Sequence, residues 1–179
     1  FRSRGKSKVI LALHGYGQLA QFFARKFAQL DPSYGLVIPE GPHRFYLEGS
    51  SGRVGASWMT KEWRAQDIEE NTRYLLALIE KVKVANATAT FYLLGFSQGG
   101  ATAARLYQYR PELFEKLILW ASVFPPDVSV QDFNETGNLH FAIGDEDPYF
   151  QDANKQEVLQ TYRNLGFKIH EFKGKHDIE

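Results

Sequence analysis

The chain has 179 residues, of which 44% are hydrophobic and 23% charged, and its 21 Lys and Arg residues balance its 21 Asp and Glu residues. This size and composition are typical of one globular domain, here residues 1–179, and the balanced charge provides no attraction to nucleic acid or to an anionic membrane. Because the sequence contains no cysteine, disulfides and thiolate chemistry are excluded.

The sequence shows no sign of a membrane anchor or a signal peptide. No apolar run approaches the ~20 residues that a membrane-spanning helix needs, and the basic start, residues 1–6, lacks the apolar region of a signal peptide. We therefore expect a cytoplasmic protein without stable membrane insertion, in which the basic start is a solvated lead-in.

Two apolar runs near the beginning of the chain predict buried strands of a parallel sheet. Residues 9–13 end in the motif His-Gly-Tyr-Gly at 14–17, and residues 36–38 end in a proline-containing loop. Between these strands, residues 18–30 carry apolar side chains at three- and four-residue spacing, which predicts an amphipathic helix.

Residues 43–62 show neither helical nor strand periodicity. We expect a long irregular loop with a functional role, because such loops are usually functional or disordered and tryptophan argues against disorder. Its aromatic side chains, together with the next tryptophan, favour packing in a pocket wall over contact with a membrane, since no basic amphipathic helix accompanies them. These aromatic residues are Phe45, Tyr46, Trp58 and Trp63.

Regular alternation of strands and helices fills the rest of the chain. Asp67 and Glu70 predict a capping box for a helix whose apolar face runs to residue 82. An irregular, proline-containing segment ends at Gly137. The alternation predicts an α/β domain with right-handed crossovers and a mainly parallel sheet of about six strands. The further strands are expected at residues 90–94, 117–121, 139–143 and 166–172, and further helices at 101–110 and 152–164.

The stretch around Ser97 predicts a nucleophile elbow. An apolar run ends in Gly-x-Ser-x-Gly, with Gly95 and Gly99 as the outer glycines, and a small-residue helical segment follows. An elbow holds its serine in a strained backbone conformation, and neighbours without Cβ let the strand and the helix pass close to each other. The alternative for this motif alone is an ordinary strand-to-helix turn.

A serine nucleophile needs an adjacent base that a third group orients, and the candidate bases are the five histidines. His176 follows the last strand in a Gly-containing loop from which it can reach the elbow, so it is the favoured base. We expect His140 and His170, inside apolar strands, to be satisfied sheet histidines. His14 is expected to brace the turn after the first strand, and His43 lies on the long loop before the elbow.

Three acidic residues after the strand at 139–143 are candidates for the orienting group. The chain order of Ser, acid and His matches that of α/β hydrolases. We favour Asp147, because the following proline defines the turn, and keep Asp145 as the alternative; a solvated acidic loop is the simpler interpretation of the cluster.

Acyl transfer also needs N–H donors for the oxyanion of its tetrahedral intermediate. The backbone N–H of Gln98 stands at the start of a helix, where the helix dipole favours negative charge. We assign the second donor to the backbone N–H of Tyr16, because the glycines on either side of it allow the loop to turn its amides inward.

Four stretches together resemble the signatures of the phospholipase/carboxylesterase family of α/β hydrolases, which includes acyl-protein thioesterases. They lie at residues 13–17, 95–100, 144–148 and 174–176. The resemblance implies an α/β-hydrolase fold, with helices on both faces of the sheet and no large cap domain. It also implies a triad of Ser97, Asp147 and His176, no cofactor or metal, and Trp58 in the wall of the acyl groove.

The sequence therefore predicts a serine hydrolase that cleaves carboxylic esters or thioesters of small molecules through an acyl-enzyme. A peptidase or lactonase on the same scaffold is one alternative, because substrate choice depends on the loops. A binding module that has kept the fold without catalysis is the other.

Overall fold

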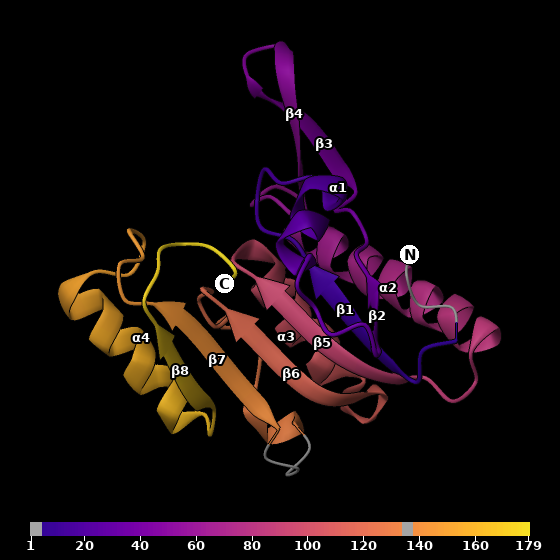
Figure 1. Ribbon diagram of the computed structural model, residues 1–179. Coiled ribbons are helices and arrows are strands. Elements are labelled where there is room, and N and C mark those ends of the chain that lie inside the picture. Colours follow the sequence, from indigo (N-terminus) through magenta and orange to yellow (C-terminus); the bar gives the residue numbers. More distant parts are fainter. Residues whose placement is uncertain (1–4, 134–137) are drawn as a thin grey trace.

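The computed structural model describes residues 5–133 and 138–179, and a six-stranded sheet forms its centre (Figure 1). The strand order is β2-β1-β5-β6-β7-β8, and all neighbouring pairs are parallel. The sheet consists of β1 (Lys8–Leu13), β2 (Tyr34–Val37), β5 (Thr90–Phe96), β6 (Phe114–Trp120), β7 (Leu139–Gly144) and β8 (Lys168–Phe172). Residues 1–4 of the predicted lead-in and residues 134–137 of the segment that ends at Gly137 lie outside the described ranges.

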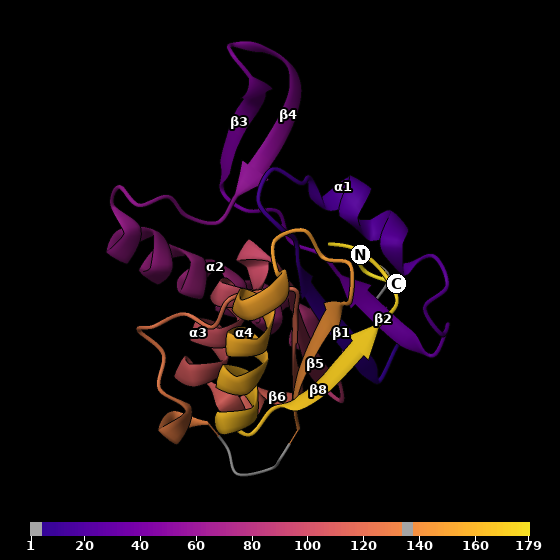
Figure 2. The ribbon, with the colours of Figure 1, turned by 90° about the vertical axis from the view of Figure 1, so that its left-hand side faces the viewer.

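Helices cover both sides of the sheet, which confirms the predicted α/β class (Figure 2). On one side lie α2 (Arg64–Ala85), α3 (Gln98–Tyr109) and α4 (Asp152–Asn164). On the other lies α1 (Ala20–Phe23), which continues into the 3₁₀ turn η1 (Ala24–Phe27). Two more 3₁₀ turns are present: η2 (Pro111–Leu113) directly precedes β6, and η3 (Val130–Asp132) lies between β6 and β7. None of the helices in the described ranges combines the length and apolar character needed to cross a bilayer.

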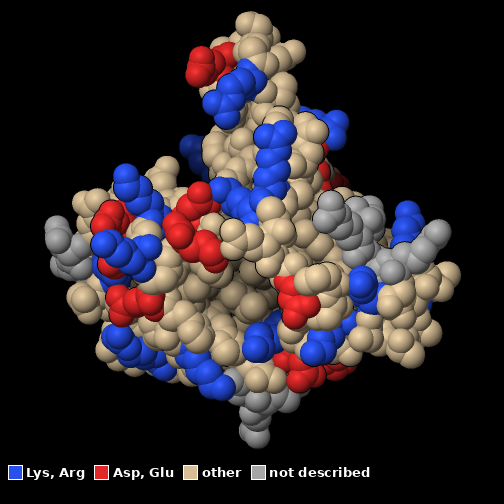
Figure 3. All heavy atoms as spheres, in the orientation of Figure 1, with Lys and Arg blue, Asp and Glu red and all other residues tan. Residues whose placement is uncertain are grey.

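The two faces of the sheet are buried to different extents. Leu11, Leu93 and Phe141 point toward the side of α2, α3 and α4 and are almost completely buried, so the main core lies there. On the opposite face, Tyr92 and Ile118 are only half-buried. This face is hollowed below β3 and β4, and its centre is largely free of charged side chains (Figure 3).

Residues 43–57 of the stretch at 43–62 form a β-hairpin where we expected an irregular loop. Strands β3 (His43–Glu48) and β4 (Ser51–Ser57) pair in antiparallel fashion around a turn in which Gly49 has a φ of 58°. The hairpin stands away from the sheet, and most of its side chains are exposed on both faces (Figure 1). Because neither face is buried over most of its length, hydrophobic alternation does not mark its strands, and the prediction from periodicity was wrong.

Two helices differ from the prediction, one in its length and one in where it begins. The helix expected over residues 18–30 is limited to α1 and η1, a short segment on the less covered side of the sheet. The capping box of Asp67 and Glu70 does not form, because α2 begins earlier, after Trp63 in a left-handed conformation with a φ of 55°. The Asp67 carboxylate instead accepts hydrogen bonds from the Thr60 N–H and from His43.

Tyr162 joins α4 to the core of the domain. Its ring stacks on Phe141 with centroids 3.7 Å apart, and its hydroxyl donates to the Ser122 carbonyl at 2.9 Å. Complete burial raises the pKa of Tyr162, so the phenol remains protonated as a donor.

Replacing Tyr162 with Phe is expected to lower the free energy of unfolding by about 1 kcal/mol, because it leaves the buried carbonyl of Ser122 without its donor. Chemical denaturation measures this loss. The matched control is Tyr109→Phe at an exposed position of α3, which should be close to neutral. Equal effects of the two substitutions would contradict the structural role of the Tyr162 hydroxyl.

Candidate active site

Ser97 lies at a sharp turn between β5 and α3 and has the strained backbone of an elbow. Its φ of 51° and ψ of −119° lie outside the regions that non-glycine residues ordinarily adopt. The Ser97 N–H donates to the Trp120 carbonyl at 2.9 Å, and its own carbonyl accepts from Gly100 at 2.9 Å. The turn is therefore held from β6 on one side and from α3 on the other.

The two outer glycines of the motif allow this turn to form. A Cβ on Gly95 would lie 2.4 Å from the Gly99 carbonyl oxygen, and a Cβ on Gly99 would lie 2.3 Å from the carbonyl oxygen of Leu13. Both distances are well inside van der Waals contact, so α3 can approach β5 and β1 only where side chains are absent. The steric explanation inferred from the sequence agrees with this packing.

His176 and Asp147 form a short hydrogen bond. The Nδ1–H of His176 donates to Asp147 Oδ2 at 2.7 Å. The Asp147 side chain is completely buried, and its other oxygen accepts from the Tyr149 N–H at 2.9 Å. Because Nδ1 is bound to the carboxylate, Nε2 is the ring nitrogen that remains to accept a proton.

The loop that carries His176 is anchored on several sides. Asp145, the alternative acid of the sequence analysis, is exposed, and its carboxylate accepts from the Gly174 N–H at 3.0 Å instead of binding the imidazole. The Trp120 indole donates to the Asp177 carbonyl at 2.8 Å, and the Asp177 carboxylate forms an ion pair with Lys26 of η1. These contacts fix the backbone on both sides of the histidine.

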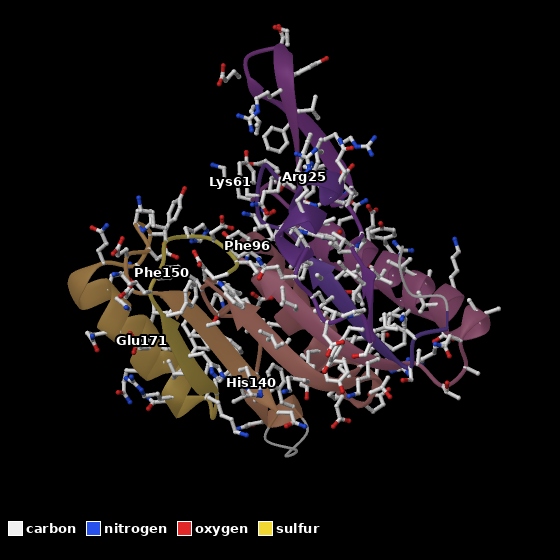
Figure 4. All side chains as sticks on the ribbon, in the orientation of Figure 1. Arg25, Lys61, Phe96, His140, Phe150 and Glu171 are labelled. Atoms are coloured by element: carbon white, nitrogen blue, oxygen red, sulfur yellow. The ribbon has the colours of Figure 1, made fainter. Side chains whose placement is uncertain are left out.

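Ser97 and His176 line the same cavity, which has a volume of about 360 Å³. The histidine ring lies against the aromatic rings of Phe96, Tyr149 and Phe150, with centroids 4.9, 4.6 and 6.4 Å away. Phe96 and Phe150 both lie at the edge of the sheet where the strands end (Figure 4). The sequence analysis did not identify Tyr149 and Phe150, although their position directly after the acidic turn is a signal that could have found them.

The two predicted oxyanion donors lie in the loops that meet at Ser97. Gly15 packs so closely on the elbow that a Cβ there would lie 3.2 Å from Ser97 Cβ, which brings the neighbouring Tyr16 to the same turn. Gln98 is the first residue of α3. Within the described residues, neither the Tyr16 N–H nor the Gln98 N–H has a hydrogen-bond acceptor, so both remain able to donate to a ligand.

The side chain of Gln98 has a structural role that the sequence analysis missed. Its oxygen accepts from the Trp58 N–H at 3.0 Å, and its nitrogen donates to the Met59 carbonyl at 2.9 Å. It also lies within hydrogen-bonding distance of Ser57 Oγ at 3.1 Å. Gln98 therefore ties the segment that leaves the hairpin to the first turn of α3.

Trp58 does not line the cavity at Ser97, contrary to the expectation from the family resemblance. Its side chain is completely buried, and the indole nitrogen donates to the His14 carbonyl at 2.8 Å. None of the other aromatic residues proposed as pocket wall, Phe45, Tyr46 and Trp63, lines this cavity either. A buried indole N–H needs an acceptor, and here the acceptor is a carbonyl of the loop after β1. Trp58 therefore supports that loop.

His14 braces the loop after β1, as predicted. Its Nδ1–H donates to the Gly15 carbonyl at 2.8 Å, and its Nε2 accepts from the Gly41 N–H at 2.9 Å. Burial lowers the pKa of His14, outweighing the opposing effects of the Gly15 carbonyl and of the nearby Glu40 charge. The ring is therefore neutral and has a defined tautomer.

The other histidines lie away from Ser97. His43 bonds to Asp67 at 3.1 Å. His140 lies toward the opposite end of the sheet (Figure 4), and its Nδ1 is 2.8 Å from Nε2 of His170. The expectation that His140 is a satisfied sheet histidine was wrong, because its buried Nε2 has no hydrogen-bond partner among the residues that the structure describes. Across the described ranges, no three His, Cys, Asp or Glu side chains gather in a way that would hold a metal ion.

Replacing Gln98 with Ala is expected to lower the free energy of unfolding by about 2 kcal/mol, since the Trp58 N–H and the Met59 carbonyl lose their partner. Thermal or chemical denaturation measures this effect. Gln66→Ala, which removes an exposed glutamine bonded to Glu70 on α2, is the control and should cost much less. A Gln98→Ala protein as stable as the control variant would show that this side chain does not hold the segment.

The lowered pKa of His14 makes the fold sensitive to acid. The unfolded chain takes up a proton near the ordinary value of 6.5, whereas the folded chain does so only at lower pH. The unfolding free energy should therefore fall as the pH decreases from about 6.5 toward the folded-state pKa, and a His14→Gln variant should show a shallower dependence. An NMR titration that gave His14 a pKa above 6.5 would contradict this assignment.

Comparison with known proteins agrees with the fold and adds a family. The chain is similar in structure to a carboxylesterase from Mesorhizobium loti, at 14% identity over 98% of this chain and 84% of that one, with a TM-score of 0.72. It is also similar to the Bacillus cereus carboxylesterase (17% identity, 100% and 85% coverage, TM-score 0.69) and to Arabidopsis thaliana SOBER1 (18%, 96% and 91%, 0.67). At these identities the likeness shows the α/β-hydrolase fold.

A search of curated protein sequences gives no match. The model of the serine hydrolase (FSH1) family, however, matches residues 3–178 and thus nearly the whole chain. A match of this extent includes the elbow, the acidic turn and the histidine loop. The chain belongs to the FSH1 family of serine hydrolases.

Proposed function

We propose that this protein hydrolyses carboxylic esters or thioesters through an acyl-enzyme formed on Ser97. The observation that carries the proposal is the 2.7 Å bond between His176 and Asp147 beside a cavity that Ser97 shares with the histidine. A carboxylate-bound imidazole beside a strained, accessible serine is the arrangement that activates a hydroxyl for attack. Membership of the serine hydrolase family and the carboxylesterases among its structural neighbours support the same reaction class.

The reaction begins with attack by Ser97 Oγ on the acyl carbon. His176 accepts the hydroxyl proton at Nε2, and Asp147 stabilises the resulting imidazolium through its bond to Nδ1. The negative charge that develops on the carbonyl oxygen is stabilised by the backbone N–H groups of Tyr16 and Gln98, which have no other acceptor in the described part of the chain.

The tetrahedral intermediate then expels the alcohol or thiol, which takes the proton from His176. Water enters the site, gives a proton to the same imidazole and attacks the acyl carbon, and the acid leaves as Ser97 regains its proton. The rings of Phe96, Tyr149 and Phe150 limit the access of bulk water to the imidazole, which strengthens its interaction with the charges of the intermediate.

Replacing Ser97 with Ala is expected to lower the turnover of a p-nitrophenyl ester on the order of a million-fold, because the triad acts as a unit. Ser33→Ala, at an exposed position outside the site, serves as the matched control and should leave turnover unchanged. A Ser97→Ala protein that is folded and retains most of its activity would refute the proposal.

A further inference from the structure

A second and larger cavity of about 760 Å³ lies between α1 and the hairpin. Its apolar lining comes from Leu19, Phe22 and Phe23 of the α1 segment and from Val54 of β4. Phe22 and Val54 remain partly exposed, so apolar surface is open to a ligand there. The base of the hairpin lies at one end, where the Gly17 N–H donates a hydrogen bond to the Ala56 carbonyl at 2.8 Å.

All charged residues that line this cavity are cationic. Arg25 and Lys26 come from η1 and Arg53 from β4, and no acidic residue is among the lining residues. Lys26 is neutralised by Asp177, but neither arginine pairs with a carboxylate in the described ranges. Arg25 packs over the ring of Phe22, 4.8 Å from its centroid, and Arg53 has no bonded partner among these residues. Two guanidinium groups thus border an apolar cavity without a neutralising partner.

Two residues that line this cavity are linked to neighbours of the active-site residues. Gly17 lies directly after Tyr16, a proposed oxyanion donor, in the loop that packs on Ser97. Lys26 is ion-paired with Asp177, the residue next to His176. Figure 4 shows Arg25 at the base of the hairpin, and Figure 3 shows basic side chains on the hairpin and around its base.

We propose that this cavity binds an anionic group, a carboxylate or a phosphate, at the end of an apolar portion of the substrate whose ester or thioester lies at Ser97. The inference rests on the proposed function and adds a substrate class to it. The apolar walls bind the chain through burial of its methylene groups, and the two guanidinium groups bind the anion, since planar guanidinium matches the oxygens of carboxylate and phosphate.

The test compares esters of equal chain length that differ in one terminal charge. Mono-p-nitrophenyl suberate and p-nitrophenyl octanoate provide the pair with the anion on the acyl side. Octanoate esters of 4-hydroxybenzoate and of its methyl ester place the anion on the leaving group, and an acyl chain ending in phosphate distinguishes the two anions. We expect kcat/KM for at least one anionic ester to exceed that of its neutral partner, and this preference to decrease with added KCl.

Substitution of Arg53 assigns the preference to this cavity. Arg53→Gln should reduce the anionic-to-neutral ratio of kcat/KM on the order of tenfold and leave kcat/KM for the neutral ester unaffected. Arg53→Lys, which keeps the charge but not the planar guanidinium, should retain part of the preference for the anionic ester. Arg44→Gln is the matched control, because Arg44 lies on the same hairpin but outside the cavity and is paired with Glu40. Arg25→Gln should behave like Arg53→Gln.

The outcomes separate this inference from the proposed function. If the neutral esters are hydrolysed but no anionic ester is preferred, or if the preference is the same in Arg53→Gln and Arg44→Gln, the anion site is refuted and the hydrolase remains. If no ester is hydrolysed, the proposed function fails, and calorimetry with monomethyl suberate and methyl octanoate decides the site alone. If monomethyl suberate binds more tightly than methyl octanoate and Arg53→Gln abolishes this difference, the anion site is supported. Equal binding of the two compounds would overturn it.

Discussion

The site depends on the close packing of α3 against β5 and β1. At Gly95 and Gly99 the backbones of the helix and the two strands approach so closely that any Cβ would collide with a carbonyl oxygen. This approach maintains the strained, positive-φ conformation of Ser97, which costs about 1–3 kcal/mol and would otherwise relax. It also brings the loop after β1 against Ser97, so a single packing constraint positions the hydroxyl and both candidate oxyanion donors.

The remaining parts of the site reach the elbow from distant segments, and each is held by contacts of its own. Asp147 is buried and oriented by the Tyr149 N–H, while His176 is surrounded by aromatic rings and lies on a loop that Asp145 and Trp120 bind from two sides. Catalysis by such a group of residues requires geometry fixed to within a fraction of an ångström, and supporting contacts of this kind provide it.

Local patterns in the sequence predicted the parts of this structure that local physics determines. The apolar runs before Ser97 and before the acidic turn predicted strands of a parallel sheet, and the glycines around Ser97 predicted the elbow, because burial on both faces and absence of Cβ leave direct traces in the sequence. The roles proposed for Ser97, Asp147 and His176 remain predictions, although the structure brings Asp147 to His176 and places His176 and Ser97 on one cavity.

Other features could not be predicted because they depend on contacts between distant segments or on exposed surfaces. The hairpin has little buried surface and hence no periodicity, and the left-handed Trp63 that precedes α2 has no local signature. Trp58 is buried under the loop after β1 rather than exposed to a groove, and the side chain of Gln98 binds a segment that precedes α2. Only the folded chain brings these partners together.

The most direct test of the account is the reaction of the folded protein with a fluorophosphonate, followed by peptide mapping of the adduct. An activated serine should be labelled at Ser97 alone, and labelling should weaken when His176 is replaced by Ala, because the base no longer removes the hydroxyl proton. A folded protein that forms no adduct, or forms it equally well without the His176 imidazole, would contradict the claim that these residues act together.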